Sequence, residues 1–325
     1  MSNALVSILT PCHNSEAFFF RLLDSVLMQS YPYVEMIVVD NDSKDKTPEI
    51  VKGYIPRFEE RGYTLKYIHQ EDAGPSAAIN NGLKRIKGEY LIMPDSDDYF
   101  ADKDTITIMV EKFFNLPDEY AVVRCQQQII YERDMSKGPI EGLRMPEYDD
   151  GTNFRSCLLG EGYVYPAVGY MVKVKYLREL TNMEIYNTYY SGQNRQVFLP
   201  LYYCYKCYSI DRPLVNYLVR ESSISHGDYA KYDVLFKLYN LFEAYIDAIF
   251  DTIKPMTSED RIYYRQAFLA KESLDMALYA KSLNRTDDAK KMIDNYYKYG
   301  GSKGKLLKFR LLSIVNRVRR KIFGR

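Results

Sequence analysis

The chain has 325 residues and a formal net charge of +1; 46% of its residues are hydrophobic and 27% are charged. This composition is typical of a folded globular protein, and the balanced charge excludes an overall electrostatic field that would attract nucleic acid. The five cysteines stand at irregular spacings, which suits reduced thiols in a cytosol. Because no signal peptide precedes the first predicted strand and no run reaches the roughly 20 apolar residues of a membrane span, we expect a cytoplasmic protein.

Over the first hundred residues, short apolar runs alternate with segments whose apolar residues recur at helical spacing. The apolar runs predict strands at residues 5–9, 35–39, 65–69 and 90–93. Helices are predicted at residues 15–29 with Ser15 as the N-cap, from Thr47 with Pro48 in the first turn, and at residues 74–87. This order of elements predicts right-handed crossovers and a largely parallel sheet, and therefore an α/β fold.

A polar cluster follows each of these four strands. In chain order, the clusters are residues 11–14, 40–43, 70–74 and 95–98. Ligands of open parallel sheets bind beyond the carboxyl ends of the strands. We therefore expect the four clusters to form one composite site.

The pattern is weaker after residue 98. It predicts strands at residues 122–131, 168–174 and 208–219 and a helix at residues 193–203. From about residue 230 it predicts helices alone, at residues 232–250, 258–283 and 287–299. Ser258 and Thr286 are the expected N-terminal caps of the last two, because acidic residues follow each of them in the first turn.

Asp95, Ser96 and Asp97 form a D-x-D motif in the turn after the fourth strand. Alternate side chains of an extended backbone can face the same side, so the two carboxylates can act together. They offer the hard oxygen ligands that Mg²⁺ and Mn²⁺ prefer, and such a cation bridges a diphosphate and stabilises it as a leaving group. The alternative is an acidic surface turn that caps the next helix; the position at a strand's carboxyl end favours the metal site.

Several segments occur in the order known from one enzyme family. They are residues 6–14, 25–31, 35–47, 74–83 and 88–92, followed by the D-x-D motif. Together they resemble family 2 of the inverting glycosyltransferases, densely over residues 4–100 and more thinly to about residue 226. The resemblance implies a Rossmann-like, mostly parallel sheet of the GT-A type, to which this chain adds a helical C-terminal extension. It also implies transfer of a sugar, with inversion, from a nucleotide diphosphate donor, with a UDP-sugar favoured.

The resemblance also divides the chain. Residues 1–226 are expected to form the GT-A-like domain, with a nucleotide-binding half (1–100) and an acceptor half (101–226). Residues 227–300 form the helical extension, and residues 301–325 form a basic amphipathic tail. The partners implied are the sugar nucleotide and, as acceptor, a cell-surface polysaccharide or a lipid-linked glycan.

The family motifs assign nucleotide contacts to the first two clusters. Pro11 and His13 are expected to line the base and ribose pocket, where His13 replaces the family's usual Tyr with another flat ring. Asp40 and Asn41 occupy the family's acidic pair. Asn41 offers a carbonyl oxygen that could accept a hydrogen bond from the imide N–H of uracil, although without a charge.

The same motifs assign the diphosphate end of the donor site. Gly74 would allow close approach of the backbone to the donor, and Asn80 would line the same cleft. Asp97 is the expected metal ligand and the central catalytic residue. Asp95 would bind the metal, through a water molecule or directly, or the ribose, and Ser96 would contact the donor between them. The cofactor expected is Mn²⁺ or Mg²⁺.

The catalytic base is the weakest point of the resemblance. An inverting transferase needs a group that takes the proton of the acceptor hydroxyl, and Gln193 and Asn194 stand where the family has acids. Three alternatives remain open at this point: Asn194 binds the acceptor while Glu184 or Asp228 is the base, the acceptor arrives already activated, or activity has been lost.

Two features near the carboxyl terminus complete the expected site. Residues 220–226 resemble the family's closing segment, in which Arg220 would pair with phosphate oxygens and His226 would complete the metal shell. The tail then carries apolar residues on one helical stripe and basic residues opposite. The stripe contains Leu307, Leu311, Ile314, Val315, Val318 and Ile322, and the opposite side contains Lys303, Arg310, Arg317 and Arg320. Such a helix can lie on an anionic membrane, here the inner face of the plasma membrane, or dock on protein.

Other functions fit the sequence less well. A non-catalytic module that binds a sugar nucleotide or a partner is the main alternative, because Asn194 departs from the family. A nucleotidyltransferase would carry a Gly-rich basic loop where residues 11–14 stand. A NAD-dependent dehydrogenase is disfavoured because no G-x-G-x-x-G follows the first strand.

Overall fold

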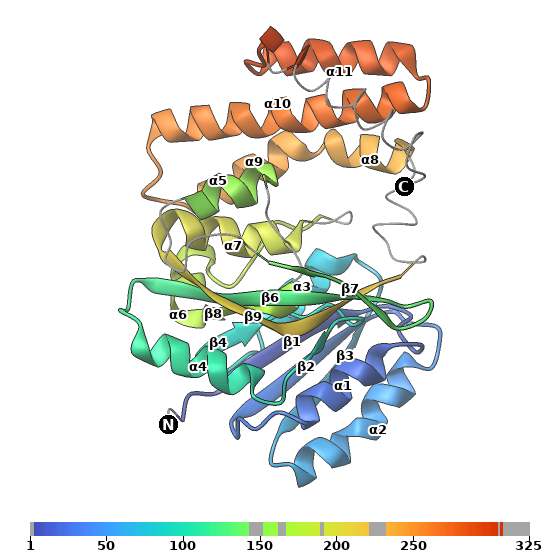
Figure 1. Cartoon of the computed structure of the whole chain (residues 1–325), viewed down its shortest axis with the longest axis vertical. Coiled ribbons are helices and arrows are strands. Elements are labelled where there is room, and N and C mark those ends of the chain that lie inside the picture. The colour runs from blue at the N-terminus through green and yellow to red at the C-terminus, as the bar shows by residue number, and fades with distance from the viewer. Residues whose placement is uncertain are drawn as a thin grey trace. The chain divides into compact units, whose positions relative to one another are not determined.

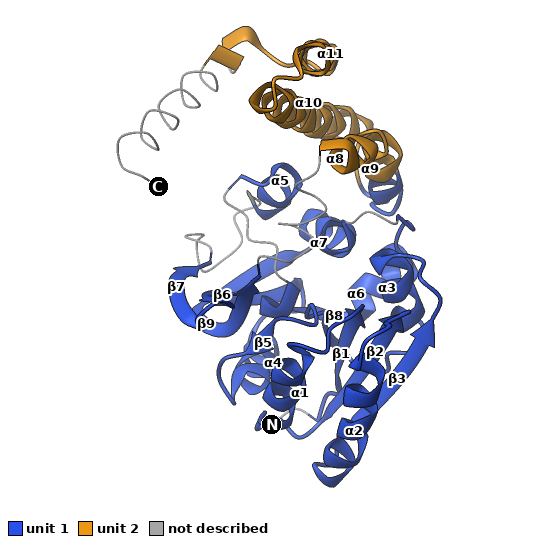
Figure 2. Ribbon diagram, turned by 90° about the vertical axis from the view of Figure 1, so that its right-hand side faces the viewer, with its two compact units in different colours: residues 1–223, 248–255 blue, residues 224–247, 256–325 orange. Residues whose placement is uncertain are grey.

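The computed structural model describes residues 3–142, 152–161, 167–188, 192–220, 232–304 and 306–307. The chain forms two compact units (Figure 2). The first contains Met1–Ser223 with Ala248–Pro255, and the second contains Ile224–Asp247 with Met256–Arg325. The candidate site lies in the first unit, and each unit is considered by itself.

The first unit begins with strictly alternating strands and helices (Figure 1). They are β1 (Val6–Cys12), α1 (Phe19–Leu27), β2 (Val34–Asn41), α2 (Thr47–Glu60), β3 (Thr64–Gln70), α3 (Pro75–Leu83) and β4 (Tyr90–Ile92). β1 pairs in parallel with both β2 and β4, and β2 pairs in parallel with β3. The predicted parallel half of the α/β fold is therefore confirmed, and all four predicted strands occur.

The second half of the unit completes the sheet with mixed pairing. Its elements are β5 (Tyr99–Phe100), α4 (Thr105–Asn115), β6 (Tyr120–Tyr131), β7 (Ser136–Glu141), α5 (Thr152–Leu159), the 3₁₀ turn η1 (Ala167–Gly169), β8 (Tyr170–Lys173), α6 (Val174–Thr181), α7 (Gln193–Cys204) and β9 (Lys206–Val219). The strand order is β3-β2-β1-β4-β8-β6-β9-β5, with β7 paired to β6. β8 is antiparallel to β4 and β6, whereas β9 is parallel to β6.

Both faces of the central strands are buried. Val6 and Ile8 of β1 pack with Phe19 of α1 and Met109 of α4 in one hydrophobic cluster, which also includes α2. The intervening Leu9 is equally buried and contacts α3 at Gly82 on the other face. α1, α2 and α4 thus lie on one side of the sheet and α3, α6 and α7 on the other (Figure 1). Burial on both faces explains why the strands are continuous apolar runs.

Several predicted helix ends and strands were wrong in detail. α1 begins at Phe19 rather than at Ser15, because residues 16–18 form turns and Ser15 bonds to neighbouring loops instead. Residues 167–169 form a 3₁₀ turn before β8, where the sequence predicted strand from residue 168. The single helix predicted at residues 232–250 is two, α8 (Tyr232–Tyr239) and α9 (Phe242–Asp251), separated by a turn.

The second unit is helical in its described residues. α10 (Ser258–Ser282) packs against α8 and α11 (Thr286–Lys298), with Ala270, Leu274, Tyr296 and Leu306 as a small core. The N-cap of α10 is Thr257, whose Oγ1 accepts a hydrogen bond of 3.0 Å from the backbone N of Asp260, so the predicted cap Ser258 is the first helical residue. Within the described ranges, no helix is both long and apolar enough to cross a bilayer. Most of the predicted basic tail, from residue 308, lies outside these ranges.

Gly88 gives a test of the packing around the amino end of β1. A Cβ at this buried position would lie 2.6 Å from the backbone N of Ser7 and 2.7 Å from the carbonyl O of Leu5. We expect Gly88→Ala to lower the free energy of unfolding by about 1–3 kcal/mol, because backbone atoms cannot move aside cheaply. Gly53→Ala is the control, since nothing lies within 4 Å of that Cβ inside α2. Urea unfolding of both variants checks this, and equal stabilities would contradict it.

Candidate functional site

The loops after β1 and β2 are locked together by reciprocal hydrogen bonds. The backbone N of Asn14 donates to Ser43 Oγ at 2.9 Å, and the backbone N of Lys44 donates to Asn14 Oδ1 at 2.8 Å. The backbone N of Ser15 donates to Thr47 Oγ1 at 2.7 Å. Asn14 and Asp42 have positive φ angles of 48° and 65°, which Asn and Asp tolerate better than most residues.

The D-x-D turn is tied to the first of these loops. Ser96 Oγ lies 2.9 Å from Ser15 Oγ, and the backbone N of Asp98 closes the turn onto the carbonyl O of Asp95 at 3.2 Å. Pro11 lies at the end of β1, where β4 has already ended, so the missing amide hydrogen is tolerated there. The first, second and fourth predicted clusters therefore come together at one edge of the sheet.

Asp40 lies beneath this edge. Its carboxylate is fully buried; Oδ1 accepts from the backbone N of Ser43 at 3.0 Å, and Oδ2 accepts from Tyr67 Oη at 2.5 Å. Burial and the neighbouring Asp40 carboxylate raise the pKa of Tyr67, which keeps the phenol a donor. These contacts hold the β2 loop in place from below.

Asn41 connects the second cluster to the first and the third. Its carbonyl O accepts from His13 Nδ1 at 2.7 Å, and its Nδ2 donates to Asp72 Oδ1 at 2.5 Å. Its Oδ1 accepts from Gln70 Nε2 at 3.0 Å and from the backbone N of Ala73 at 3.2 Å. The exposed His13 ring also accepts from Asn14 Nδ2 at 2.9 Å, which assigns the hydrogen to Nδ1.

The third cluster ends at the amino terminus of α3. Gly74 has φ 83° and ψ 167°, a conformation that is essentially restricted to glycine, and Pro75 occupies the first helical turn. The first backbone N–H groups of a helix have no intrahelical acceptor, so a helix amino terminus can bind an anion. Asn80, farther along α3, exchanges two hydrogen bonds of 2.8 Å with the backbone of Ile185, so its amide anchors that segment.

Three carboxylates crowd the fourth cluster. Asp97 Oδ2 accepts from both Nε and Nη2 of Arg220, each at 2.7 Å, and the two side chains are only 16% and 15% exposed. The Arg220 guanidinium also stacks over the ring of Phe18, 4.0 Å from its centroid. Burial and the charge of Asp97 raise the pKa of Asp95 to about 7, and burial with both neighbouring charges raises the pKa of Asp98 well above its ordinary value.

These residues fit a divalent cation that is shared with a substrate. In the described part of the chain, Asp98 Oδ2 is buried without a hydrogen-bond partner, and a cation beside Asp95 and Asp97 would offset the charge repulsion that raises the pKa of Asp95. The described residues do not bring three Asp, Glu, His or Cys side chains together as a preformed metal site. Mg²⁺ and Mn²⁺ sites of this kind take one or two carboxylates and complete their shell with phosphate and water. His226, the third expected ligand, lies outside the described residues.

The acceptor side is described in part. Asn194 lies in the first turn of α7, after Gly192, whose φ is 88°. Glu184 is exposed on the segment that Asn80 anchors from α3, and Gln196 of α7 donates to the carbonyl O of Tyr186 in the same segment at 3.1 Å. Asp228, the other candidate base, is outside the described residues.

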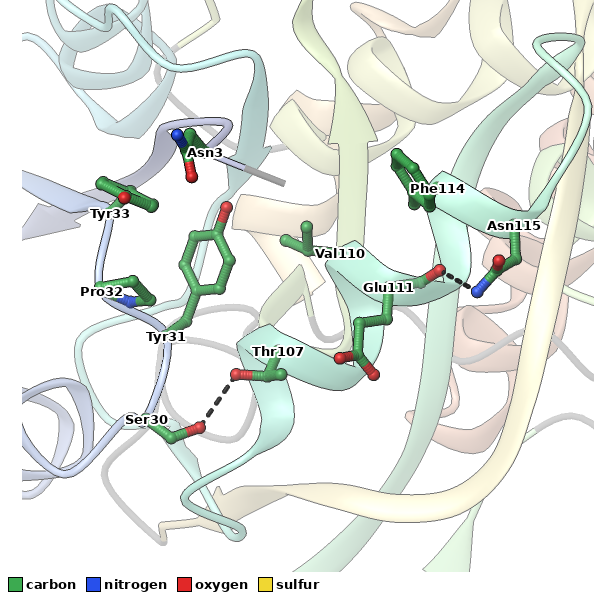
Figure 3. Close-up of a pocket in the computed structure, with 10 residues that line it drawn as sticks. All are labelled: Asn3, Ser30, Tyr31, Pro32, Tyr33, Thr107, Val110, Glu111, Phe114 and Asn115. Carbon is green, nitrogen blue, oxygen red and sulfur yellow. Dashed lines mark hydrogen bonds between the residues drawn. The ribbon is translucent and has the colours of Figure 1, made fainter. Parts of the chain in front are cut away.

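A cavity of about 500 Å³ lies at the opposite edge of the sheet. Figure 3 shows Tyr31, Pro32 and Tyr33 on one wall and Thr107, Val110 and Phe114 of α4 on the other. These residues precede β2 or belong to α4, whereas the four polar clusters follow their strands. The cavity is therefore separate from the candidate site.

Sequence reasoning did not single out Asp72, Tyr67 or Phe18. Asp72 lies inside the predicted cluster at residues 70–74, so its position at the edge was foreseeable. The contacts of Tyr67 with Asp40 and of Phe18 with Arg220 join distant parts of the chain, and no local pattern signals them.

Comparison with known proteins places this chain among glycosyltransferases. Residues 7–199 match the model of a family described as glycosyl transferase family 2. Glycosyltransferase GlyA of Streptococcus pneumoniae is 34% identical over 117 residues, which are 36% of this chain and 16% of that protein. The "Putative teichuronic acid biosynthesis glycosyltransferase TuaG" of Bacillus subtilis is 39% identical over 107 residues, 33% of this chain and 41% of that protein. The chain thus matches less than half the length of either relative.

Solved structures share the fold at low identity. TarS 1-349 of S. aureus, crystallised with UDP-GlcNAc, has a TM-score of 0.64 at 18% identity and covers 92% of this chain and 93% of its own. The mannosyltransferase PcManGT of Pyrobaculum calidifontis, in complex with GDP-Man and Mn²⁺, has a TM-score of 0.55 at 16% identity, covering 98% and 81%. The expected GT-A-type fold is confirmed.

The buried hydrogen bond from Tyr67 to Asp40 helps to hold the β2 loop, and its contribution to stability can be tested. We expect Tyr67→Phe to lower the free energy of unfolding by about 1–3 kcal/mol, because it removes a donor from a fully buried carboxylate. Tyr54→Phe is the matched control: its hydroxyl also donates to a carboxylate, that of Asp24, but that side chain is 43% exposed, and water can replace the bond. Equal losses in chemical denaturation would contradict the assigned difference.

Proposed function

The chain belongs to glycosyl transferase family 2, and we propose that it moves a sugar, with inversion and with the help of a divalent cation, from a UDP-sugar donor to a cell-surface polysaccharide or lipid-linked glycan. The observation that supports this proposal is the direct bonding of the end of β2 and its loop with the loops after β1 and β3, and of the β1 loop with the D-x-D turn. That bonding brings a flat ring, a helix amino terminus and a carboxylate pair to one edge, which suits a base, a diphosphate and a cation.

The donor would extend along this edge. His13, with Pro11 beside it, would stack on the base, and the first turn of α3 after Gly74 would receive the diphosphate. Asp95 and Asp97, with Ser96 between them, would hold Mn²⁺ or Mg²⁺ together with that diphosphate, and the bound cation supplies Lewis-acid charge for the leaving group. His226 is proposed as a further ligand. Asp40 and Asn80 would support the loop and the adjoining segment rather than touch the donor.

Arg220 would change partners when the donor binds. Its Nε and Nη2 both bond to Oδ2 of Asp97, whose carboxylate is also proposed to bind the cation. The two positive charges therefore compete for one carboxylate. A diphosphate offers the guanidinium new oxygen acceptors and resolves the competition, since bidentate Arg–phosphate pairs are strong.

The acceptor half is proposed to use Asn194 for binding. An amide cannot take the proton of the attacking hydroxyl, so a carboxylate such as Glu184 or Asp228 is needed as the base. The name of the Bacillus subtilis relative supports a cell-wall polymer as acceptor. The basic and apolar pattern of residues 301–325 supports contact with the inner face of the plasma membrane, where lipid-linked acceptors lie.

A non-catalytic module that binds the sugar nucleotide is the second candidate, and the amide at residue 194 favours it. The two candidates differ in turnover. A module would bind nucleotide without releasing the sugar, even when acceptor glycans are added.

Donor hydrolysis tests the proposed activity. Purified protein, incubated with a panel of nucleotide sugars and Mn²⁺, is expected to release nucleoside diphosphate slowly, and EDTA or Asp97→Ala should lower the rate at least about 100-fold, as loss of a central electrostatic group does. Asp294→Ala, an exposed aspartate of the second unit, is the control. Release that is unaffected by Asp97→Ala would contradict the assigned site. Calorimetric binding without release, with or without acceptor glycans, would favour the module.

The exchange by Arg220 is tested by measuring cation and nucleotide binding separately. We expect Arg220→Gln to weaken UDP binding in the presence of Mn²⁺ about tenfold or more, through loss of charge-assisted bonds, and to leave the affinity for Mn²⁺ alone equal or higher. Arg212→Gln, which breaks the more exposed pair with Asp102, should change neither affinity. Weaker Mn²⁺ binding in Arg220→Gln would show that Arg220 supports the cation site instead of competing for it.

A further inference from the structure

The ring of Phe18 contacts the ion pair between Arg220 and Asp97. Cζ of Arg220 lies 4.0 Å from the centroid of the ring, while Nε and Nη2 of the same guanidinium bond to Asp97 Oδ2. Phe18 is almost fully buried, and little of the Arg220 side chain is exposed. A cation that lies over an aromatic ring is attracted to it, and the attraction is stronger where water is excluded. This contact therefore helps to decide where the guanidinium lies.

We propose that Phe18 is a positioning residue for Arg220, and that its ring holds the guanidinium both in the pair with Asp97 and in contact with the diphosphate of the donor. This inference rests on the proposed function, because it concerns the exchange of partners within the same donor site. A phenyl ring has no lone pair, so it does not compete with a carboxylate or a phosphate for the N–H groups of arginine. The ring can keep its contact while the acceptors change.

The ring itself is held by a small hydrophobic cluster. Phe18 packs with Ile130 of β6 and Leu218 of β9, which are both buried, and Tyr99 of β5 packs against this cluster. The ring is therefore already ordered by its apolar neighbours. Only the arginine side chain has to be fixed when the cation settles on the ring, which keeps the entropic cost of the contact small.

The ring is also tied to the turn that carries Asp97. The backbone N of Phe18 donates to the carbonyl O of Ser15 at 3.1 Å. Ser15 Oγ in turn lies 2.9 Å from Oγ of Ser96, the residue before Asp97. The ring and the carboxylate that share Arg220 are thus linked through one short series of hydrogen bonds.

The strand end that carries Arg220 is fixed as well. The backbone N of Leu218, two residues before Arg220, donates to Asp98 Oδ1 at 3.2 Å. The carbonyl O of Val219 accepts from the backbone N of Glu132 at 3.1 Å. Because the backbone is held on both sides, the proposed exchange needs a movement of the arginine side chain alone, over the face of the ring.

Calorimetric titration of UDP in the presence of Mn²⁺ tests this role. Phe18→Leu keeps an apolar side chain in the cluster but removes the ring, and we expect it to weaken UDP binding about 2- to 10-fold without weakening the binding of Mn²⁺ alone. Phe18→Tyr keeps a ring and should restore most of the affinity. Phe20→Leu is the matched control, because the ring of Phe20 lies under a different cation, Arg21, with Cζ 4.8 Å from its centroid. This control should bind UDP like the wild-type protein.

A double-mutant cycle separates the positioning of Arg220 from a general effect on packing. In the Arg220→Gln background, Phe18→Leu should change the UDP affinity less than about twofold, because the ring then has no cation to hold. A general effect on packing would weaken binding equally in both backgrounds. Urea unfolding shows whether each variant is folded, and Phe18→Met, which fills more of the space of the ring, gives the same test if Phe18→Leu does not fold.

The outcomes separate this inference from the proposed function. If the wild-type protein binds UDP and Phe18→Leu binds it equally well, the inference is wrong and the donor site stands. An equal loss of affinity with and without Arg220 also overturns the inference. If the wild-type protein binds no nucleoside diphosphate, both the inference and the proposed function fall.

Discussion

β1 lies between two parallel neighbours, β2 and β4, and the candidate site depends on this pairing. Parallel strands end at the same edge, so the loops after β1, β2, β3 and β4 must meet there. Hydrogen bonds between side chains and backbone then fix the loops: Asn14 and Ser43 join the first two, and Ser15 and Ser96 join the first to the D-x-D turn. Each of these bonds joins a group in one loop to a partner in the neighbouring loop.

Electrostatic repulsion acts among the carboxylates at this edge, a pattern that is common at binding sites. Asp95 and Asp98 have raised pKa values because burial and neighbouring carboxylates disfavour their charged forms. Arg220 neutralises Asp97 from the end of the last strand of the sheet. Three acids stand within four residues of this partly buried turn, where their charges repel one another. The arrangement is understandable if a cation and a diphosphate complete it.

The sequence predicted the frame of the site well, because its signals are local. Apolar runs marked β1 to β4, and the polar clusters that follow them do lie at one edge. What the sequence could not predict are contacts between distant residues. Asn41 was expected to offer its amide oxygen to a base, but Gln70 and Ala73 occupy that oxygen, 29 and 32 positions away. The pair of Arg220 and Asp97 spans 123 positions.

Local propensity also misled the prediction at particular residues. Ser15 has the side chain of a helix cap, but its hydroxyl bonds to Ser96 and its backbone to Thr47, so the helix starts at Phe19. α4 was missed because β-branched Thr and Ile residues fill its first turn, and these favour strands. In both cases, tertiary contacts decide the local structure. The GT-A-type fold is defined by the pairing of strands across the whole sheet.

A crystal structure of the protein with UDP and Mn²⁺ would test the central claim most directly. We expect one nucleotide at the carboxyl edge of the sheet, with its base against His13, its diphosphate between the start of α3 and Asp97, and Arg220 turned from Asp97 toward phosphate. A nucleotide bound elsewhere, such as in the cavity beside Tyr31 and Phe114, or a diphosphate that contacts neither α3 nor Asp97, would contradict it.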